Sequence, residues 1–501
     1  MSDATAPASP DTASPPPPSA LTPSTTLAPV DRRIFFVAAG MGLLLLAFSG
    51  RYGFHRDELY FLDCARHLSA AYVDQPVFTP VLARLSLTLF GVSVVGLRLW
   101  SDLAAFASVV LGGLLAREFG GGRTAQLLGA LGVATAPAYL GADHLLETTS
   151  FDLLAWPALA LVLVRIGRTG TTRLFVPAGV ILGLGLANKH SIAFFALAVV
   201  LGTLLSGGRR VIVNRWFLAG AAVAALFTVP DLWWQATHGW ATIDMTRSLA
   251  RENGGIGNAI SFLFSQLFMA SPVLIPVWLI GLRVFFAATA GAKPYYVAAL
   301  YPVLIAAGAV VLEHRWTEAG VMADQLRSLG IALTVAFLVT LPFTLPVLPA
   351  KDGGLFSKVN PVSAETIGWP ELVHSVASVW HALPAGQRAE GVIFTSNYGE
   401  AGAVNELGRA DGLPTAVSGH NSEWFWGPGN PDATTVVAVF SGQAISSDTA
   451  PFIELFARCR VAATIHNAEG VSNQEEGGHV YVCTGPVQTW GALWPSLRHY
   501  D

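Results

Sequence analysis

Residues 32–60 read RRIFFVAAGMGLLLLAFSGRYGFHRDELY, an apolar run between arginines that is followed by a charged cluster. The apolar part, near residues 34–50, approaches the ~17–25 residues that an α-helix needs to cross a bilayer. Arg32 and Arg33 precede it, and basic residues favour the cytoplasmic side of a membrane. We therefore expect a first span that begins inside and delivers the cluster HRDELY (55–60) to the outer face.

The rest of the body also alternates long apolar runs with short polar segments. Of the 501 residues, 52% are hydrophobic and 12% are charged, whereas charged residues usually make up about a quarter of a soluble protein. Spans of ~20 residues predict an α-helical polytopic membrane protein with about 10–11 spans. The predicted spans lie near residues 34–50, 94–115, 124–142, 152–166, 174–188, 190–206, 214–234, 258–282, 296–312 and 328–349.

The polar breaks between these runs predict the topology. Arginines gather in alternate breaks, which favours an inner position for those breaks. Residues 51–93, 143–151 and 235–257 then form the outer breaks. Residues 258–292 are too many for one span and slightly few for two. We favour two crossings, or one crossing and a short re-entrant piece, with Pro272 and Pro276 breaking the helix.

Three parts are predicted. Residues 1–32 are rich in proline and form a disordered cytoplasmic tail, and residues 33–350 form the multi-span body. Residues 351–501 carry charges, turns and strand-like runs (392–395, 435–440 and 480–483), with helix-like runs between them such as 370–382 and 449–458. This pattern predicts a soluble α/β domain that lies outside the membrane by parity. Cys459 and Cys483 can form one disulfide if that end is exported, and two unpaired buried thiols are an equal alternative.

Charge and cysteine content exclude other classes. The 29 Lys and Arg against 33 Asp and Glu leave no basic surface for nucleic acid. Three cysteines exclude a disulfide-dense scaffold.

The first outer break carries the adjacent acids Asp57 and Glu58. Charges near the hydrocarbon cost about 2.5–3.5 kcal/mol each on insertion scales, so they are rarely incidental. A carboxylate in such a place can serve as a general base. The alternative is a solvated loop in which the acids face water or pair with Arg56.

The second outer break adds Asp143, His144, Glu147 and Asp152. Asp152 opens an apolar run, so it can cap a helix as well as belong to a site. Together with His55, these acids could hold a divalent cation, although the sequence shows no metal-ligand spacing.

Cations at the membrane boundary are few. Lys189, Lys293 and Arg98 could each meet a phosphate or snorkel to the interface. His238 lies in the third outer break and indicates a function only together with the other candidate residues.

These residues, in this order, resemble the membrane glycosyltransferases of family 39, which include protein O-mannosyltransferases and bacterial aminoarabinose transferases. The motifs that carry the resemblance span residues 33–350: HRDELY (55–60), YVDQP (72–76), GLR (96–98), TTSFD (148–152), NKH (188–190) and KPYY (293–296), followed by Tyr301 and Pro302.

The resemblance implies a GT-C fold and an inverting transfer of a sugar from a polyprenyl-phosphate carrier to an acceptor hydroxyl outside the plasma membrane. Asp57 would take the acceptor proton, and cations such as Arg98 and Lys293 would hold the lipid phosphate. We therefore predict two catalytic residues, Asp57 and Glu58. The predicted substrate-binding residues are His55, Arg56, Asp74, Arg98, Asp152, Lys189, His238, Lys293 and Tyr296.

Three departures from the family pattern matter. Aminoarabinose transferases read Glu-Lys-Pro where this chain reads Asp74-Gln75-Pro76, so a lysine for the lipid phosphate is missing there. The region before Lys293 looks shortened by about one span. Residues 351–501 do not look like the sugar-binding modules of O-mannosyltransferases, which leaves a lipid, glycan or other envelope acceptor.

Two other function classes stay open. A transporter or flippase of lipid-linked sugars would use the same charges without covalent transfer, and an inactive scaffold would only bind glycans. Residues 397–400 and 419–426 place aromatic side chains beside polar ones, which suits acceptor guidance or a packed turn near the interface.

Overall fold

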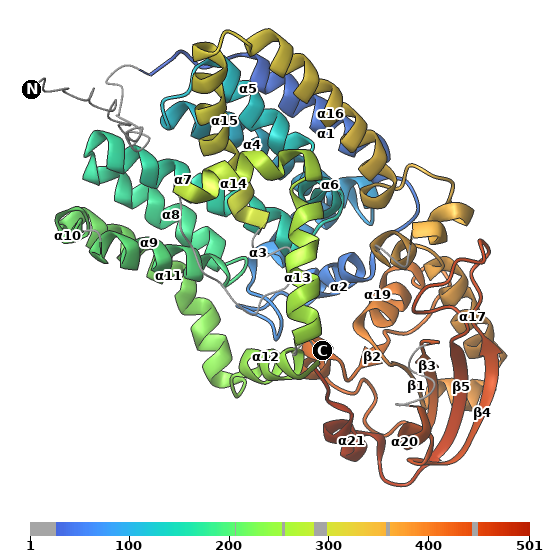
Figure 1. The fold of residues 1–501 in the computed structure, drawn as a ribbon. Helices are drawn as coiled ribbons and strands as arrows, with labels where there is room; N and C mark the ends of the chain where they lie inside the picture. The colour runs from blue at the N-terminus through green and yellow to red at the C-terminus, as the bar shows by residue number, and fades with distance from the viewer. Residues whose placement is uncertain are drawn as a thin grey trace, which may run out of the picture.

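The computed structural model describes residues 27–205, 207–252, 256–284, 298–356, 361–442 and 449–500. A body of apolar helices is joined to a C-terminal α/β region that contains one sheet (Figure 1). The helical body runs from blue to yellow in the figure, and the C-terminal region (residues 361–442 and 449–500) runs from orange to red. The predicted fold class, a multi-pass helical membrane protein with a C-terminal α/β part, is confirmed.

Every predicted apolar run forms helix in the described part of the chain. The helices of the body are α1 (Arg33–Ser49), α4 (Val94–Glu118), α5 (Arg123–Ala134), α6 (Pro137–Asp143), α7 (Thr148–Thr169), α8 (Phe175–Leu186), α9 (Ile192–Leu205), α10 (Arg209–Ile212), α11 (Arg215–Thr237), α12 (Ala241–Glu252), α13 (Ile256–Met269), α14 (Ile275–Val284), α15 (Tyr301–Glu318) and α16 (Met322–Thr344).

Fewer helices are long enough to cross a membrane than the sequence predicts. Within the described ranges, five helices are long and apolar enough, or up to seven if each of two bent pairs counts as one span. The difference arises because three predicted spans form apolar helices of 10–17 residues. The bent pairs are α5 with α6, which meet at 54°, and Ile260–Met269 with Pro272–Ile280, which meet at 91°. The predicted break at Pro272 is thus confirmed.

Two short helices, α2 (Arg56–Arg66) and α3 (Phe78–Phe90), lie between the first and second long helices of the chain. The first turn of α2 is a capping box. The His55 ring accepts a hydrogen bond from the backbone N–H of Asp57, while the Glu58 carboxylate accepts from the backbone N–H of His55. Acids in the first turn also face the positive end of the helix dipole. The motif HRDE therefore starts a helix.

The C-terminal region is built on a five-stranded sheet of order β2-β1-β3-β5-β4. Its strands are β1 (Gly391–Thr395), β2 (Val417–Ser418), β3 (Thr435–Phe440), β4 (Phe456–Thr464) and β5 (His479–Pro486), and its main helices are α17 (Trp369–Ala382) and α19 (Tyr398–Leu407). β1 runs parallel to β2 and β3, while β5 runs antiparallel to β3 and β4. Cys459 and Cys483 form a disulfide between β4 and β5.

One hydrophobic cluster joins the body to the C-terminal region. It includes Leu59 and Tyr60 of α2 together with Trp369 of α17 and Ile393 of β1. Helix α19 lies against α2 (Figure 1). A Cβ atom on Gly402 would come within 2.7 Å of the Leu59 backbone, so only glycine permits this close approach.

The predicted tail is ordered at its end. Residues 1–26 lie outside the described residues. Asp31 is buried, and its backbone N–H donates to Gln126 Oε1 at 2.9 Å. Packing therefore begins a few residues before the predicted boundary at residue 32.

Candidate functional site

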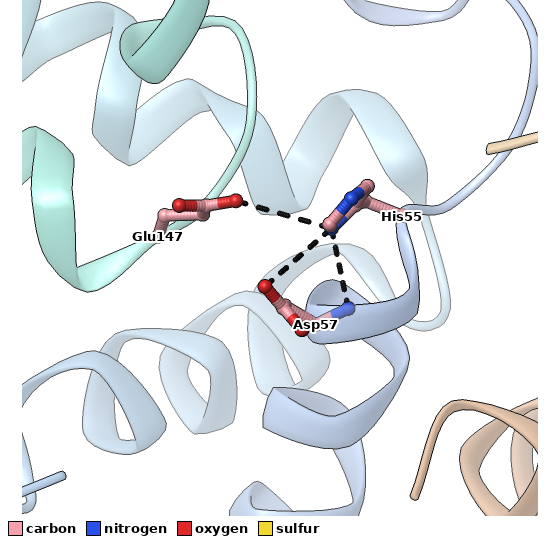
Figure 2. A group of neighbouring side chains, drawn as sticks. All are labelled: His55, Asp57 and Glu147. Atoms are coloured by element: carbon pink, nitrogen blue, oxygen red, sulfur yellow. Dashed lines mark hydrogen bonds and ion pairs between the residues drawn. The ribbon is translucent and has the colours of Figure 1, made fainter. Parts of the chain in front are cut away.

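The start of α2 gathers charged side chains from three distant segments. His55 Nδ1 lies 3.7 Å from Asp57 Oδ2 and 3.9 Å from Glu147 Oε1 (Figure 2). On the other side of the ring, Nε2 lies 3.1 Å from Glu365 Oε2. Three carboxylates thus surround one buried imidazole, which we call the His55 cluster (His55, Asp57, Glu147 and Glu365).

The charge of the His55 cluster favours a proton on the imidazole. Burial alone would lower the pKa of His55. The hydrogen bond to Glu365 and the negative charges of Asp57 and Glu147 outweigh burial and raise the pKa to about 9. When the ring is neutral, Nδ1 can accept the cap hydrogen bond of α2. When the ring is protonated, the same atom faces the two carboxylates.

Asp57 accepts a hydrogen bond at one carboxylate oxygen, and its side chain is partly exposed. Its Oδ1 atom accepts a hydrogen bond from the Tyr398 hydroxyl at 2.8 Å. The side chain of Asp57 is 33% exposed, so solvent can reach it. A carboxylate with this exposure and these partners can accept a proton.

Glu58 has the opposite environment. It is fully buried and forms a bidentate pair with Arg98, whose Nε and Nη2 atoms lie 2.9 and 2.8 Å from the carboxylate oxygens. Arg98 also donates to the backbone carbonyls of Ser49 and Gly53. Burial alone would raise the pKa of Glu58, but the charge and hydrogen bonds of Arg98 keep it below its ordinary value. This pair holds the outer loop together, and its geometry favours a structural role.

Lys189 and Asp152 lie beside the N-terminal turns of α7. The Lys189 ammonium donates to Thr149 Oγ1 at 3.2 Å. Asp152 accepts hydrogen bonds from Ser191 Oγ at 2.8 Å and from the Trp156 indole at 2.9 Å. Asp152 is inside the helix, whose N-cap is Glu147, so the alternative that Asp152 caps the helix is wrong.

Glu147 feels the charges of both Lys189 and Asp57. Burial and the charge of Asp57 raise the pKa of Glu147 to about 7, although His55 and Lys189 oppose the rise. Lys189 is therefore close enough to influence the His55 cluster.

The other predicted residues lie in different places. Asp74 is half-buried and accepts a hydrogen bond from the Tyr60 hydroxyl at 2.7 Å; desolvation raises its pKa to about 6. Arg56 donates to Gln474 and stacks over the Tyr398 ring at 4.9 Å. Lys293 and Tyr296 lie outside the described residues.

His238 lines a separate cavity of about 280 Å³. Its ring stacks on Trp234 at 4.1 Å and meets the ring of Phe425 at 5.2 Å. Phe425 and Trp426 of the C-terminal region also line the cavity. None of the described residues that line this cavity belongs to the His55 cluster.

The structure adds three residues to the prediction. Glu147 was recognised only as a member of an acidic break, and Glu365 was not recognised. Tyr398 was noted for acceptor guidance rather than for contact with Asp57. Glu365 and Tyr398 reach α2 from more than 300 positions away in the chain, so local patterns give no signal of the contact.

The His55 cluster has a donor set that could hold a metal ion. One ligand atom from each of His55, Asp57 and Glu147 lies within 4.8 Å of the others. Imidazole and carboxylate are ordinary ligands of divalent cations, and Glu365 sits where a carboxylate commonly orients a metal-bound histidine. A divalent cation thus stays a prediction that these residues fit.

A family model described as dolichyl-phosphate-mannose-protein mannosyltransferase matches residues 74–234. Among curated proteins, the chain is 25% identical over 232 residues to the lipid A galacturonosyltransferase RgtD from Rhizobium johnstonii. That match covers 44% of this chain and 47% of RgtD, so the chain matches about half the length of that relative.

Solved structures match over most of the chain. The apo structure of ArnT from Cupriavidus metallidurans has a TM-score of 0.53 at 16% identity and covers 90% of this chain and 97% of that one. The structure of the same protein bound to undecaprenyl phosphate has a TM-score of 0.56 at 14% identity and covers 89% and 97%. The predicted resemblance is thus confirmed: residues 74–234 are similar to the protein mannosyltransferase family, and the fold is that of ArnT.

Proposed function

We propose that this protein transfers a sugar from a polyprenyl-phosphate carrier to a hydroxyl group of an envelope acceptor. The observation that carries the proposal is the placement of Asp57. It lies at the outer end of the first apolar helix, partly exposed, in a cluster with His55 and Glu147. The family match over residues 74–234 and the ArnT fold support the same reaction class.

The chemistry is an inverting displacement. The acceptor oxygen forms a bond to the anomeric carbon while the bond from that carbon to the phosphate oxygen breaks. The acceptor proton passes to Asp57, and the carrier phosphate leaves with the electron pair of the broken bond. Because Oδ1 is engaged by Tyr398, Oδ2 is the oxygen that receives the proton.

Positive charge must stabilise the leaving phosphate. We assign this role to Lys189, which lies near Glu147 and donates a hydrogen bond to Thr149 Oγ1 at 3.2 Å. Lys293 remains a second candidate from the sequence. We do not assign the phosphate to Arg98, because Arg98 is 1% exposed and engaged by Glu58.

A divalent cation would be held by His55, Asp57 and Glu147. When bound, it would supply positive charge next to the leaving phosphate. Asp57 would then be a ligand as well as the predicted base, so chelation is a useful variable in any assay.

Charge and redox chemistry support an outward-facing site. The disulfide between Cys459 and Cys483 supports an oxidising compartment for the C-terminal region. Since Tyr398 of that region touches Asp57, the same side of the plasma membrane must hold the site. The N-terminal arginines favour the cytoplasm, so the site faces outward.

The first substrates to test come from the relatives. RgtD is named for galacturonic acid and lipid A, and an ArnT structure holds undecaprenyl phosphate. The experiment incubates membranes containing the full chain with radiolabelled undecaprenyl-phosphate sugars, galacturonic acid first, and lipid A. We expect label in the lipid A fraction and release of free undecaprenyl phosphate.

Asp57→Asn tests the proposed base. We expect transfer to fall about 10²- to 10⁴-fold, while binding of undecaprenyl phosphate persists. Movement of the labelled lipid across the bilayer without a new covalent product would favour the transporter. An Asp57→Asn variant with full transfer would remove Asp57 from the mechanism.

A further inference from the structure

The C-terminal region reaches the proposed base directly. The Tyr398 hydroxyl donates to Asp57 Oδ1 at 2.8 Å across 341 positions of sequence. Tyr398 is the first residue of α19, and Asp57 lies in the first turn of α2. Two helix N-termini from opposite ends of the chain therefore meet at one hydrogen bond.

The backbone at Tyr398 is fixed by contacts other than the hydrogen bond to Asp57. The Asn397 side chain caps α19 by accepting a hydrogen bond from the backbone N–H of Glu400 at 2.9 Å. The Glu400 carboxylate in turn accepts a hydrogen bond from the backbone N–H of Asn397. This capping box defines the first turn of α19. The close contact of Gly402 with Leu59 then sets the distance between the two helices.

The Tyr398 ring is also fixed by its neighbours. It packs on Tyr60 with ring centres 4.7 Å apart and on His420 at 4.5 Å. The Arg56 guanidinium lies 4.9 Å from the ring centre, and Gln474 holds Arg56 from the C-terminal side. Contacts on several sides leave the hydroxyl little freedom, which is what a precisely placed group requires.

The hydrogen bond distinguishes the two oxygens of Asp57. Oδ1 accepts from Tyr398, whereas Oδ2 lies 3.7 Å from His55 Nδ1. A carboxylate held by one oxygen cannot rotate freely about its terminal bond, so the other oxygen keeps one direction. Preorganisation of this kind can be worth as much as the proton transfer itself, because small misplacements reduce the rate strongly.

We propose that Tyr398 is a positioning residue, which holds Asp57 Oδ1 so that Oδ2 faces the acceptor hydroxyl. The inference rests on the proposed function, and it makes the C-terminal region part of the active site. A protein in which this region only bound glycans would not need the contact.

The test uses Tyr398→Phe in the full chain. This variant keeps the ring and its stacking and removes only the hydroxyl. Its matched control is Tyr481→Phe, which removes a hydroxyl of the same C-terminal region that contacts His479 at 3.3 Å. With undecaprenyl-phosphate galacturonic acid and lipid A, we expect kcat of Tyr398→Phe to fall about 10- to 100-fold with KM for the donor nearly unchanged.

A second measurement does not depend on turnover. The infrared difference between wild type and Asp57→Asn at one fixed pH identifies the carboxylate stretching bands of Asp57. Loss of the hydrogen bond in Tyr398→Phe should shift these bands, and Tyr481→Phe should leave them in place.

The outcomes separate the two proposals. Shifted bands and a reduced kcat support both. Bands that stay in place in folded Tyr398→Phe overturn the positioning role, whatever the rate. Shifted bands in a wild-type protein that transfers no sugar would support the contact and reject the proposed function. A rise in KM with kcat unchanged would also overturn the positioning role, because Tyr398 would then serve donor binding.

Discussion

Asp57 and Glu58 are neighbours in the chain, but they occupy two different regions of the molecule. Asp57 is on the outer side of α2, a third exposed, among side chains from α7 and the C-terminal region. Glu58 is on the inner side, fully buried, and paired with Arg98 of α4. The two neighbours differ in accessibility: Asp57 is open to solvent, as the proposed base requires, whereas Glu58 is committed to a buried ion pair.

The largest expected effect concerns the inner side. Glu58→Gln keeps the shape of the side chain but leaves the Arg98 charge buried without its partner. Breaking one side of a buried pair typically costs about 3–5 kcal/mol of folding free energy. We expect a large fall in Tm and in folded yield in detergent.

Asp57→Asn is the matched control for Glu58→Gln. It makes the same chemical change one position away, at a partly exposed site, and should retain the Tm of the wild type nearly unchanged. Adding Arg98→Met to Glu58→Gln should recover part of the lost stability, because no unpaired charge remains buried. Equal losses of Tm in the two single variants would contradict the comparison.

The second prediction concerns the contact between α19 and α2. Gly402→Val places atoms where the Leu59 backbone already lies 2.7 Å from a Cβ position. Overpacking of this kind costs about 1–3 kcal/mol, and it should also reduce transfer by moving Tyr398 away from Asp57. Gly386→Val is the control, since a Cβ there meets nothing within 4 Å. Transfer at the wild-type rate in folded Gly402→Val would show that the helices need not approach so closely.

The third prediction is a pH dependence of stability at the His55 cluster. The pKa of His55 is raised to about 9 from an ordinary 6.5, so its protonation stabilises the folded state. This stabilisation is complete below about pH 6.5 and is lost as pH rises through about 9. His55→Asn keeps an N-cap acceptor and removes the titration. Tm measured from pH 6 to 10 should therefore fall less in His55→Asn than in wild type.

Much of the fold could be predicted from particular stretches. The apolar runs are long, so each forms helix in the described residues, although the runs near 124–142 and 258–282 are each broken into two bent helices. β3 begins and ends at the predicted residues, Thr435 and Phe440. Residues 449–458 were predicted as one helix, which is wrong at its end: the helix stops at Ile453 and β4 begins at Phe456. The pairing of β4 with β5 overrides the weak local helical pattern there.

The site was only partly predictable, for a physical reason. The motif HRDE identifies Asp57 because a charge beside an apolar span costs free energy and because the motif is contiguous in the sequence. The sequence does not show which neighbours surround that acid, because Glu365 and Tyr398 arrive through tertiary packing. It also gave Arg98 and Glu58 the appearance of reactive groups, since a buried ion pair and a catalytic pair use the same residue types.

The hydrophobic cluster that α2 shares with the C-terminal region has a consequence for biosynthesis. Residue 57 is made early and residue 398 late, with most of the helical body inserted in between. Until the last quarter of the chain has been made, the apolar side of α2 lacks the residues of the C-terminal region that cover it. Contacts between residues so far apart in the sequence form slowly, and the intermediates that lack them are prone to aggregation. Packing of α2 should therefore be a late step in the folding of this protein.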